Sequence, residues 1–129
     1  LLYKAGWIKH PSTIWLLESA YNYRWLYLHM MALNDEYKKR YNHTKDHLAI
    51  QKLGEVLSQP PKNAKINKLA TEPKPAMPEH CKVDGDVVAS YRNYYILEKK
   101  RFATWKSPAK VPDWYKEGKI YGNEEEQYI

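Results

Sequence analysis

The residues of this chain that could carry chemistry stand among aromatic side chains. Glu18 and Asn22 lie four residues apart, so on a helix they project from one side. A carboxylate in aromatic surroundings can act as a general acid or base, which makes Glu18 and Asn22 the candidate catalytic residues. The sequence gives more weight to a structural alternative, in which both side chains hold a neighbouring helix or a loop by hydrogen bonds. A single buried glutamate is no motif.

A second group combines cations with tyrosines. In the run Tyr91-Arg92-Asn93-Tyr94-Tyr95, a guanidinium can grip a phosphate with its planar fork, and a tyrosine ring can stack on a base. Three further cations follow about two turns later on the same expected helix. An equally weighted alternative is a core helix whose arginine pairs with Glu18 or another acid. The predicted nucleic-acid contacts in this group are Arg92, Asn93, Lys99, Lys100 and Arg101.

Aromatic and basic residues alternate again near the end of the chain, between Asp113 and Gly122. Such a segment can lie along a nucleic-acid backbone or stack its rings on bases. The equally weighted alternative is a C-terminal arm whose Trp114 plugs the helical core. The predicted contacts in this segment are Trp114, Tyr115, Lys116 and Lys119.

Histidine and cysteine patterns argue against a metal or a covalent mechanism. His43 and His47 have the i, i+4 spacing that can chelate zinc on a helix, but a helix cap expected at Thr44 separates them. Cys81 is the one cysteine, which excludes an internal disulfide. Its neighbour His80 is adjacent in sequence, and adjacent side chains seldom aim at each other. The sequence therefore predicts no metal site and no cofactor.

Charge is unevenly distributed along the chain. The net charge is +6 and the pI about 9.2. Residues 113–129 carry a net charge of −3, which leaves +9 for residues 1–112. A basic body with an acidic tail at residues 123–129 fits a polyanion-binding surface, and a merely solvated basic surface is about as well supported.

Periodicity predicts an all-α fold, a compact helical bundle of one domain over residues 1–129. A first aromatic-rich helix is expected from residues 10–13 to about Tyr41, with apolar side chains pointing almost all round, so that it is buried in the bundle. A shorter helix follows at residues 45–57. A third, long and aromatic-rich, runs from Asp84 or Asp86 to about Trp105. A Pro-rich connection at residues 58–82 is expected to wrap over the bundle, and a final turn starts at Asp113.

The chain shows no targeting or membrane segment. No signal peptide is visible, and the longest uncharged run in the first helix, Trp25 to Asn34, is too short to cross a bilayer. These features predict a cytoplasmic protein, in the host cell if the source is a virus. The chain opens with Leu1 rather than Met, from which we expect a processed product or a fragment lacking an N-terminal segment.

The clusters above also carry a resemblance. The pattern resembles a group of small, uncharacterised proteins from phages and marine viral sequences, over residues 3–115. In that group a segment rich in His and Lys precedes the match, which implies that such a segment is missing here. The shared residues are His10-Pro11, Trp15, Asn22-Tyr23, Trp25-Leu26, Tyr37, Arg40-Tyr41, Ala76-Met77-Pro78, Tyr91 to Tyr95, Trp105 and Pro112-Asp113-Trp114.

A second resemblance concerns the end of the chain. The stretch from Trp114 to Tyr121 is similar to the C-terminal arm of phage pyrimidine-dimer DNA glycosylases of the endonuclease V type. The resemblance implies a DNA-contact role for this arm, in a small, basic, metal-free enzyme that flips a base and attacks with an N-terminal amine. Leu1 departs from the small N-terminal residue of that family, and Glu18 does not align with its glutamate. Catalysis by this chain is thus left open.

The sequence as a whole predicts a helical nucleic-acid-binding domain, with DNA as partner and a role in viral DNA repair or modification. Glu18 and Asn22 would line a pocket, and the cations would contact phosphates. The alternative is a protein-interaction or structural helical module whose Tyr and Trp side chains serve packing. A small-molecule enzyme, which would need a closed pocket around Glu18, is a third option.

Overall fold

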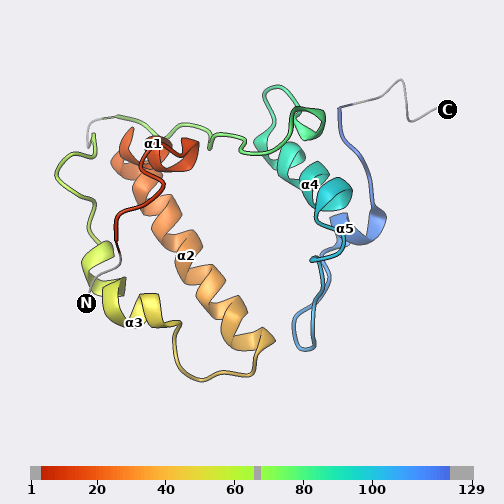
Figure 1. The fold of residues 1–129 in the computed structure, drawn as a ribbon, viewed down its shortest axis with the longest axis horizontal. Coiled ribbons are helices and arrows are strands. Elements are labelled where there is room, and N and C mark those ends of the chain that lie inside the picture. The colour runs from red at the N-terminus through yellow and green to blue at the C-terminus, as the bar shows by residue number, and fades with distance from the viewer. Residues whose placement is uncertain (1–3, 66–67, 123–129) are drawn as a thin grey trace. The chain divides into compact units, whose positions relative to one another are not determined.

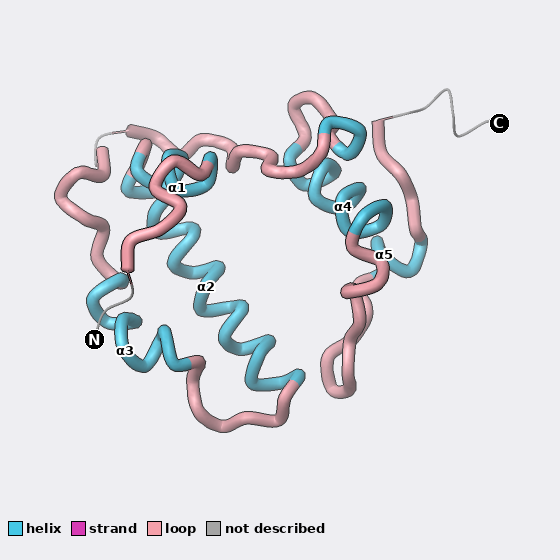
Figure 2. The backbone as a smooth tube through the Cα atoms, in the orientation of Figure 1, coloured by secondary structure: helices cyan, strands magenta, loops and turns pink. Residues whose placement is uncertain are grey.

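The computed structural model describes residues 4–65 and 68–122, so the acidic tail expected at 123–129 lies outside the described residues. Within them helices are joined by loops and no strand occurs, which confirms the all-α prediction (Figure 2). None of the helices in this part of the chain is long and apolar enough to span a bilayer. The chain divides into two compact units, Leu1–Lys74 and Pro75–Ile129. The helices in order are α1 Pro11–Leu17, α2 Ala20–Arg40, α3 Leu48–Leu57, the 3-10 helix η1 Glu79–Cys81, α4 Val87–Glu98 and α5 Asp113–Glu117 (Figure 1).

The first unit begins with two helices where the sequence predicted one. Ser19 adopts an extended conformation (φ −157°, ψ 141°) and its side chain accepts a hydrogen bond from the Tyr21 amide, so α1 ends and α2 starts anew. The Ser19 hydroxyl also donates to the Lys68 carbonyl at 2.9 Å. The single-helix prediction was wrong because the Ser19 hydroxyl caps a new helix. It is held in that conformation by its hydrogen bond to the Lys68 carbonyl of a distant loop.

Helix α3 packs on α2 and starts later than predicted. The buried Asn34 of α2 accepts from the His47 amide at 2.7 Å and donates to the Asp46 carboxylate at 2.9 Å, which holds residues 46–47 off the helix. His47 then caps α3 by accepting from the Ala49 amide. At the other end of α3, hydroxyls of Tyr23 and Tyr27 donate to carbonyls of Leu57 and Gly54. Burial raises the pKa of Tyr23, and the neighbouring Tyr27 raises it further.

The part of the Pro-rich connection that belongs to the first unit is attached to α1 and α2. The indole nitrogen of Trp15, a side chain only 3% exposed, donates to the Thr71 carbonyl at 3.0 Å. The Asn22 carboxamide donates to the Thr71 hydroxyl and to the Trp15 carbonyl, and accepts from the Thr71 amide at 2.9 Å. The loop is therefore attached through backbone groups that would otherwise be unsatisfied.

The second unit is built around α4. Asp86 caps this helix by accepting from the Ala89 amide at 3.0 Å, close to the predicted start. The buried Ser90 ties the preceding turn to the helix through the Val83 amide. The helix ends at Glu98, well before the predicted Trp105. The ring of Phe102, which was expected to continue the buried stripe, is instead 63% exposed in the turn that follows the helix.

The C-terminal arm of this unit returns along α4 after the short helix α5. Gly118, with φ 66°, ends α5 in the left-handed region. The Asn93 carboxamide then holds Tyr121 by accepting from its amide at 2.8 Å and donating to its carbonyl at 3.0 Å. At Gly122 (φ 87°) a Cβ would lie 3.0 Å from a methyl group of Val83, so this position favours glycine.

The interior of both units is small and unusually polar. Among the described residues, the polar side chains Ser19, Asn22, Asn34, Ser90 and Asn93 are buried, as many as the apolar ones, which are Trp15, Ile50, Ala64, Cys81 and Ala89. The prediction that the first long helix is buried on nearly all sides was wrong. The buried residues of α2 are Asn22 and Asn34, whereas its large apolar side chains remain more than half exposed at Tyr21, Trp25, Leu28 and Leu33. Tyrosines and tryptophans anchor by their polar groups and leave ring faces at the surface.

Candidate functional site

The two candidate catalytic residues meet at one threonine. Asn22 is 1% exposed, and both its amide hydrogens and its oxygen are engaged by Trp15 and Thr71. The Glu18 carboxylate, at the end of α1, accepts from the Thr71 hydroxyl at a long 3.4 Å. Glu18 and Asn22 thus attach a loop by hydrogen bonds. This is the structural alternative to a catalytic role.

Arg92 and Asn93 hold the C-terminal arm of the second unit. The Arg92 guanidinium lies 5.4 Å from the Trp114 ring and donates to the Tyr121 hydroxyl at 3.4 Å. The Asn93 side chain is 2% exposed and bonds the carbonyls of Cys81 and Tyr121. The Asn93 carboxamide is therefore enclosed by protein rather than presented to a ligand.

Two of the three consecutive cations after α4 lie beside an exposed aromatic ring. Lys99 caps the helix, and its ammonium lies 4.9 Å from the Tyr94 ring and 5.9 Å from the Phe102 ring. The Arg101 guanidinium lies 4.6 Å from the same Phe102 ring, while Lys100 is exposed. Among the described residues, none of these three cations takes part in an ion pair.

The remaining predicted contacts divide into partly buried rings and exposed lysines. Trp114 contacts Tyr95 and Tyr115 edge to face, and Tyr115 lies 4.9 Å from the Trp105 ring, so these aromatics pack α5 onto the rest of the unit. Lys116 and Lys119 are exposed, and Lys119 lies 5.1 Å from the ring of Tyr121. The rings thus take the packing role, and the two lysines lie at the surface.

The net positive charge is not divided equally between the two units. Residues 1–74 hold twelve Lys and Arg against six Asp and Glu, whereas residues 75–129 hold nine of each. Within the second unit, however, residues 99–110 hold five cations and no acid: Lys99, Lys100, Arg101, Lys106 and Lys110. Within the second unit, the local excess of positive charge therefore lies in the segment after α4.

The two histidines with zinc-chelating spacing flank a tyrosine. The His43 ring stacks on Tyr37 at 5.2 Å, and the His47 ring meets Tyr37 edge-on at 5.4 Å. His47 Nδ1 is also used as the cap of α3. The pair does not share a helix, because both residues precede α3. The cap expected at Thr44 was wrong, since His47 occupies that position.

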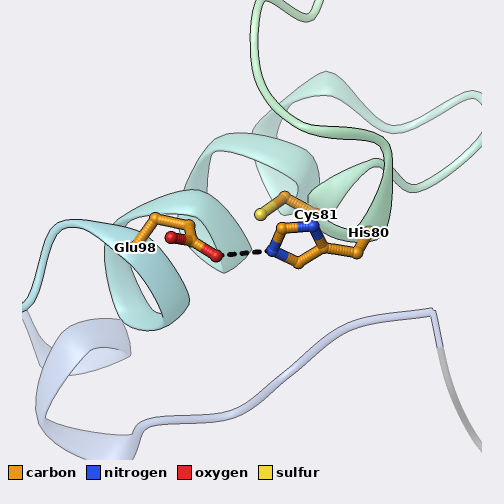
Figure 3. A group of neighbouring side chains, drawn as sticks. All are labelled: His80, Cys81 and Glu98. Atoms are coloured by element: carbon orange, nitrogen blue, oxygen red, sulfur yellow. Dashed lines mark hydrogen bonds and ion pairs between the residues drawn. The ribbon is translucent and has the colours of Figure 1, made fainter.

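A cluster that the sequence did not predict lies on η1 and the last turn of α4. His80, Cys81 and Glu98 bring one donor atom each to within 4.8 Å of one another (Figure 3). His80 Nε2 lies 2.6 Å from Glu98 Oε1. Cys81 is fully covered, while the His80 and Glu98 side chains beside it are about half exposed. Burial raises the pKa of the Cys81 thiol, and the nearby Glu98 carboxylate raises it further, which disfavours a reactive thiolate.

Two hollows lie beside these features. A polar one of about 350 Å³ is lined by His80, Lys82, Val83, Asp84, Tyr121 and Gly122, so it opens next to the cluster. An apolar one of about 190 Å³ lies between α2 and α3 and is lined in part by Met30, Tyr37 and Ile50.

Sequence reasoning missed this cluster because its third member is eighteen residues away on another element. The available signal was the adjacency of His80 and Cys81, followed by a helix whose last turn ends in Glu98. No protein-family model, no curated protein and no solved structure matches the chain.

Proposed function

We propose that the protein binds DNA through the turn that follows α4, residues 99–102, assisted by the lysines between residues 106 and 119. The observation that carries the proposal is the Phe102 ring, 63% exposed and contacted by Lys99 and Arg101. A surface ring between cations offers a base a stacking partner and offers its flanking phosphates neutralisation.

The helix dipole explains why cations follow α4, but it does not explain the exposed ring of Phe102. Positive side chains at the end of a helix suit its dipole, so Lys99, Lys100 and Arg101 would be favourable there in any protein. A phenylalanine left mostly in water gains nothing from the dipole and forgoes the burial that stabilises a core. Its exposure supports a binding role for this turn over a purely structural one.

Four further lysines extend the proposed surface beyond the turn: Lys106, Lys110, Lys116 and Lys119, all exposed. Arg92 and Trp114 have a structural role in this surface, because they hold α5 and the arm on α4. The proposed contacts differ from the predicted ones at seven positions. Lys99, Lys100, Arg101, Lys116 and Lys119 are kept, Phe102, Lys106 and Lys110 are added, and Arg92, Asn93, Trp114 and Tyr115 are left out.

The test is the salt dependence of DNA affinity, measured by fluorescence anisotropy with labelled duplex and single-stranded oligonucleotides. Each neutralised phosphate contributes about 0.9 to the slope of log K against log salt for duplex DNA and about 0.7 for single strands. The double variant K100A/R101A is expected to lower the duplex slope by roughly 1.8 if both cations contact phosphates.

The matched control is K9A/K62A, which removes two exposed lysines of the first unit and changes the net charge equally. The proposal expects this control to bind nearly as the parent does. Equal losses in the two double variants would overturn it and would indicate diffuse attraction by the net charge of the whole chain.

Substitution of Phe102 should affect the binding of single-stranded DNA and duplex DNA differently. F102A is expected to weaken single-stranded binding by about 1–3 kcal/mol, the usual contribution of a stacked base, and to leave duplex binding nearly unchanged. A variant that binds single strands as tightly as the parent would remove Phe102 from the interface.

The alternative of a protein-interaction module also has an observation in its favour. Tyr21, Trp25 and Leu28 follow one another at helical spacing on α2 and are 59%, 51% and 55% exposed. Exposed apolar side chains in a row are typical of surfaces that bind protein. Absence of DNA binding at low salt, together with concentration-dependent self-association, would favour this alternative.

A further inference from the structure

The cluster of His80, Cys81 and Glu98 combines three different donor types at the surface of the second unit. An imidazole nitrogen, a sulfur and a carboxylate oxygen converge although two come from η1 and one from α4 (Figure 3). Nitrogen, sulfur and oxygen donors together suit a borderline-soft divalent ion such as Zn²⁺, which takes all three in tetrahedral sites. Ca²⁺ and Mg²⁺ prefer oxygen alone.

The spacing of the donors is compatible with such an ion. Zinc bonds of about 2.0–2.3 Å place tetrahedral ligand atoms roughly 3.3–3.8 Å apart. The three donor atoms lie within 4.8 Å of one another, and the closest pair, His80 Nε2 and Glu98 Oε1, are 2.6 Å apart. An entering ion would therefore lengthen the imidazole–carboxylate contact by roughly 0.7–1.2 Å and draw the sulfur inward, both through side-chain rotation.

The backbone under the cluster is already fixed. The Cys81 carbonyl accepts from the buried Asn93 of α4 at 3.1 Å, and the Cys81 amide donates to the Pro78 carbonyl at 3.0 Å. Since Asn93 and Glu98 stand on the same helix, one element positions both the η1 ligands and the carboxylate. A preformed frame lowers the entropic cost of binding an ion.

The exposure of the three side chains gives an ion a way in. His80 and Glu98 are about half exposed, whereas Cys81 is fully covered. The imidazole and the carboxylate would thus capture the ion from solvent, and the thiol would complete the site from below. The polar hollow of about 350 Å³ lined by His80 and Asp84 leaves room for water or a small polar ligand at a fourth position.

We propose that His80, Cys81 and Glu98 bind a Zn²⁺-type transition-metal ion through their Nε2, Sγ and carboxylate oxygen atoms, with a fourth position open to solvent. The ion takes the place of the proton on the thiol, which leaves to solvent. Three protein ligands with one open position is the arrangement of exchangeable rather than closed structural zinc sites. The ion also ties η1 to the last turn of α4. This inference stands independently of DNA binding.

The experiment is a titration of the chelator-treated 129-residue chain with Co²⁺ and Zn²⁺, in buffer containing a phosphine reductant and no competing thiol. The expected result is one Co²⁺ per chain, with visible bands of four-coordinate cobalt and a thiolate-to-cobalt charge-transfer band in the near ultraviolet. C81S is expected to lose the charge-transfer band. H80Q and E98Q are expected to weaken Zn²⁺ binding at least about 10-fold in competition with a fluorescent zinc chelator.

Two controls make the result specific. H43Q and E117Q remove an exposed histidine and an exposed glutamate outside the cluster and are expected to bind Zn²⁺ as the parent does. Circular dichroism checks the fold of each variant, and E98Q keeps an amide that can still bond His80. Lack of the charge-transfer band in the parent, or Zn²⁺ affinity unaltered in C81S, H80Q and E98Q, would overturn the proposal.

Discussion

The two units of the molecule are each closed by one buried asparagine, but the closures are reinforced differently. In the first, Asn22 of α2 holds Thr71, which follows it by 49 residues. In the second, Asn93 of α4 holds Tyr121, which follows it by 28 residues. Both carboxamides accept from the backbone amide of the returning segment, and both are 2% exposed or less.

The two closures differ in how many other hydrogen bonds attach the returning segment. Around Asn22, the Trp15 indole also donates to the Thr71 carbonyl and the Ser19 hydroxyl to the Lys68 carbonyl, so the loop has three independent attachments. Asn93 joins two segments at once, through the carbonyls of Cys81 and Tyr121. The same side chain is thus one support among several in one unit and the central one in the other.

The largest effect is therefore expected for N93A. This change removes three hydrogen bonds and leaves buried backbone groups unpaired, for a loss of about 3 kcal/mol of unfolding free energy. Chemical denaturation gives the total, and hydrogen exchange at the Tyr121 amide tests the local release of the arm. The exposed Asn63 provides the control N63A, expected within about 0.5 kcal/mol of the parent.

A smaller loss, about 2 kcal/mol, is expected for N22A, because the Trp15 and Ser19 attachments survive. Hydrogen exchange at the Thr71 amide would accelerate less than exchange at Tyr121 does in N93A. If N22A proved the more damaging of the two, the contrast in redundancy between the units would be refuted.

The smallest effect concerns a third asparagine, Asn34. Its partner is the carboxylate of Asp46, so the strength of this contact depends on pH. Its amide and the Lys38 ammonium each lie 2.9 Å from Asp46 Oδ1, and both lower the pKa of Asp46 below its ordinary 3.8. Because the ionised form is favoured in the fold, its stabilisation is complete above about pH 4 and is lost as the pH falls through the lowered pKa.

Carboxyl titration by NMR measures this directly. D46N should remove the acid-dependent part of stability that this turn contributes, whereas the exposed D84N should not. A pKa for Asp46 at or above its ordinary value would contradict the expectation.

These contrasts also show what could be predicted from sequence. Helix type and the start of α4 at Asp86 followed from periodicity and capping residues, which act locally. The break at Ser19 and the late start of α3 could not be predicted. Each depends on a bond to a partner far along the chain, Lys68 for Ser19 and Asn34 for His47.

The candidate sites divide in the same way. The cations after α4 could be predicted because they are consecutive, and their neighbours in space are their neighbours in sequence. The roles of Asn22 and Asn93 could not be separated from binding roles, since a carboxamide serves either purpose. The cluster with Glu98 depends on how η1 is attached to α4, which the spacing of residues does not encode.

An interior made of carboxamides and hydroxyls has a thermal consequence. Unfolding exposes apolar surface, which raises the heat capacity, and polar surface, which lowers it; the usual balance is about 12–15 cal/mol/K per residue. Here Ser19, Asn22, Asn34, Ser90 and Asn93 occupy places that hydrocarbon fills in most domains. The heat-capacity increment should fall below that range, which flattens the curve of unfolding free energy against temperature and moves cold denaturation further from ambient conditions.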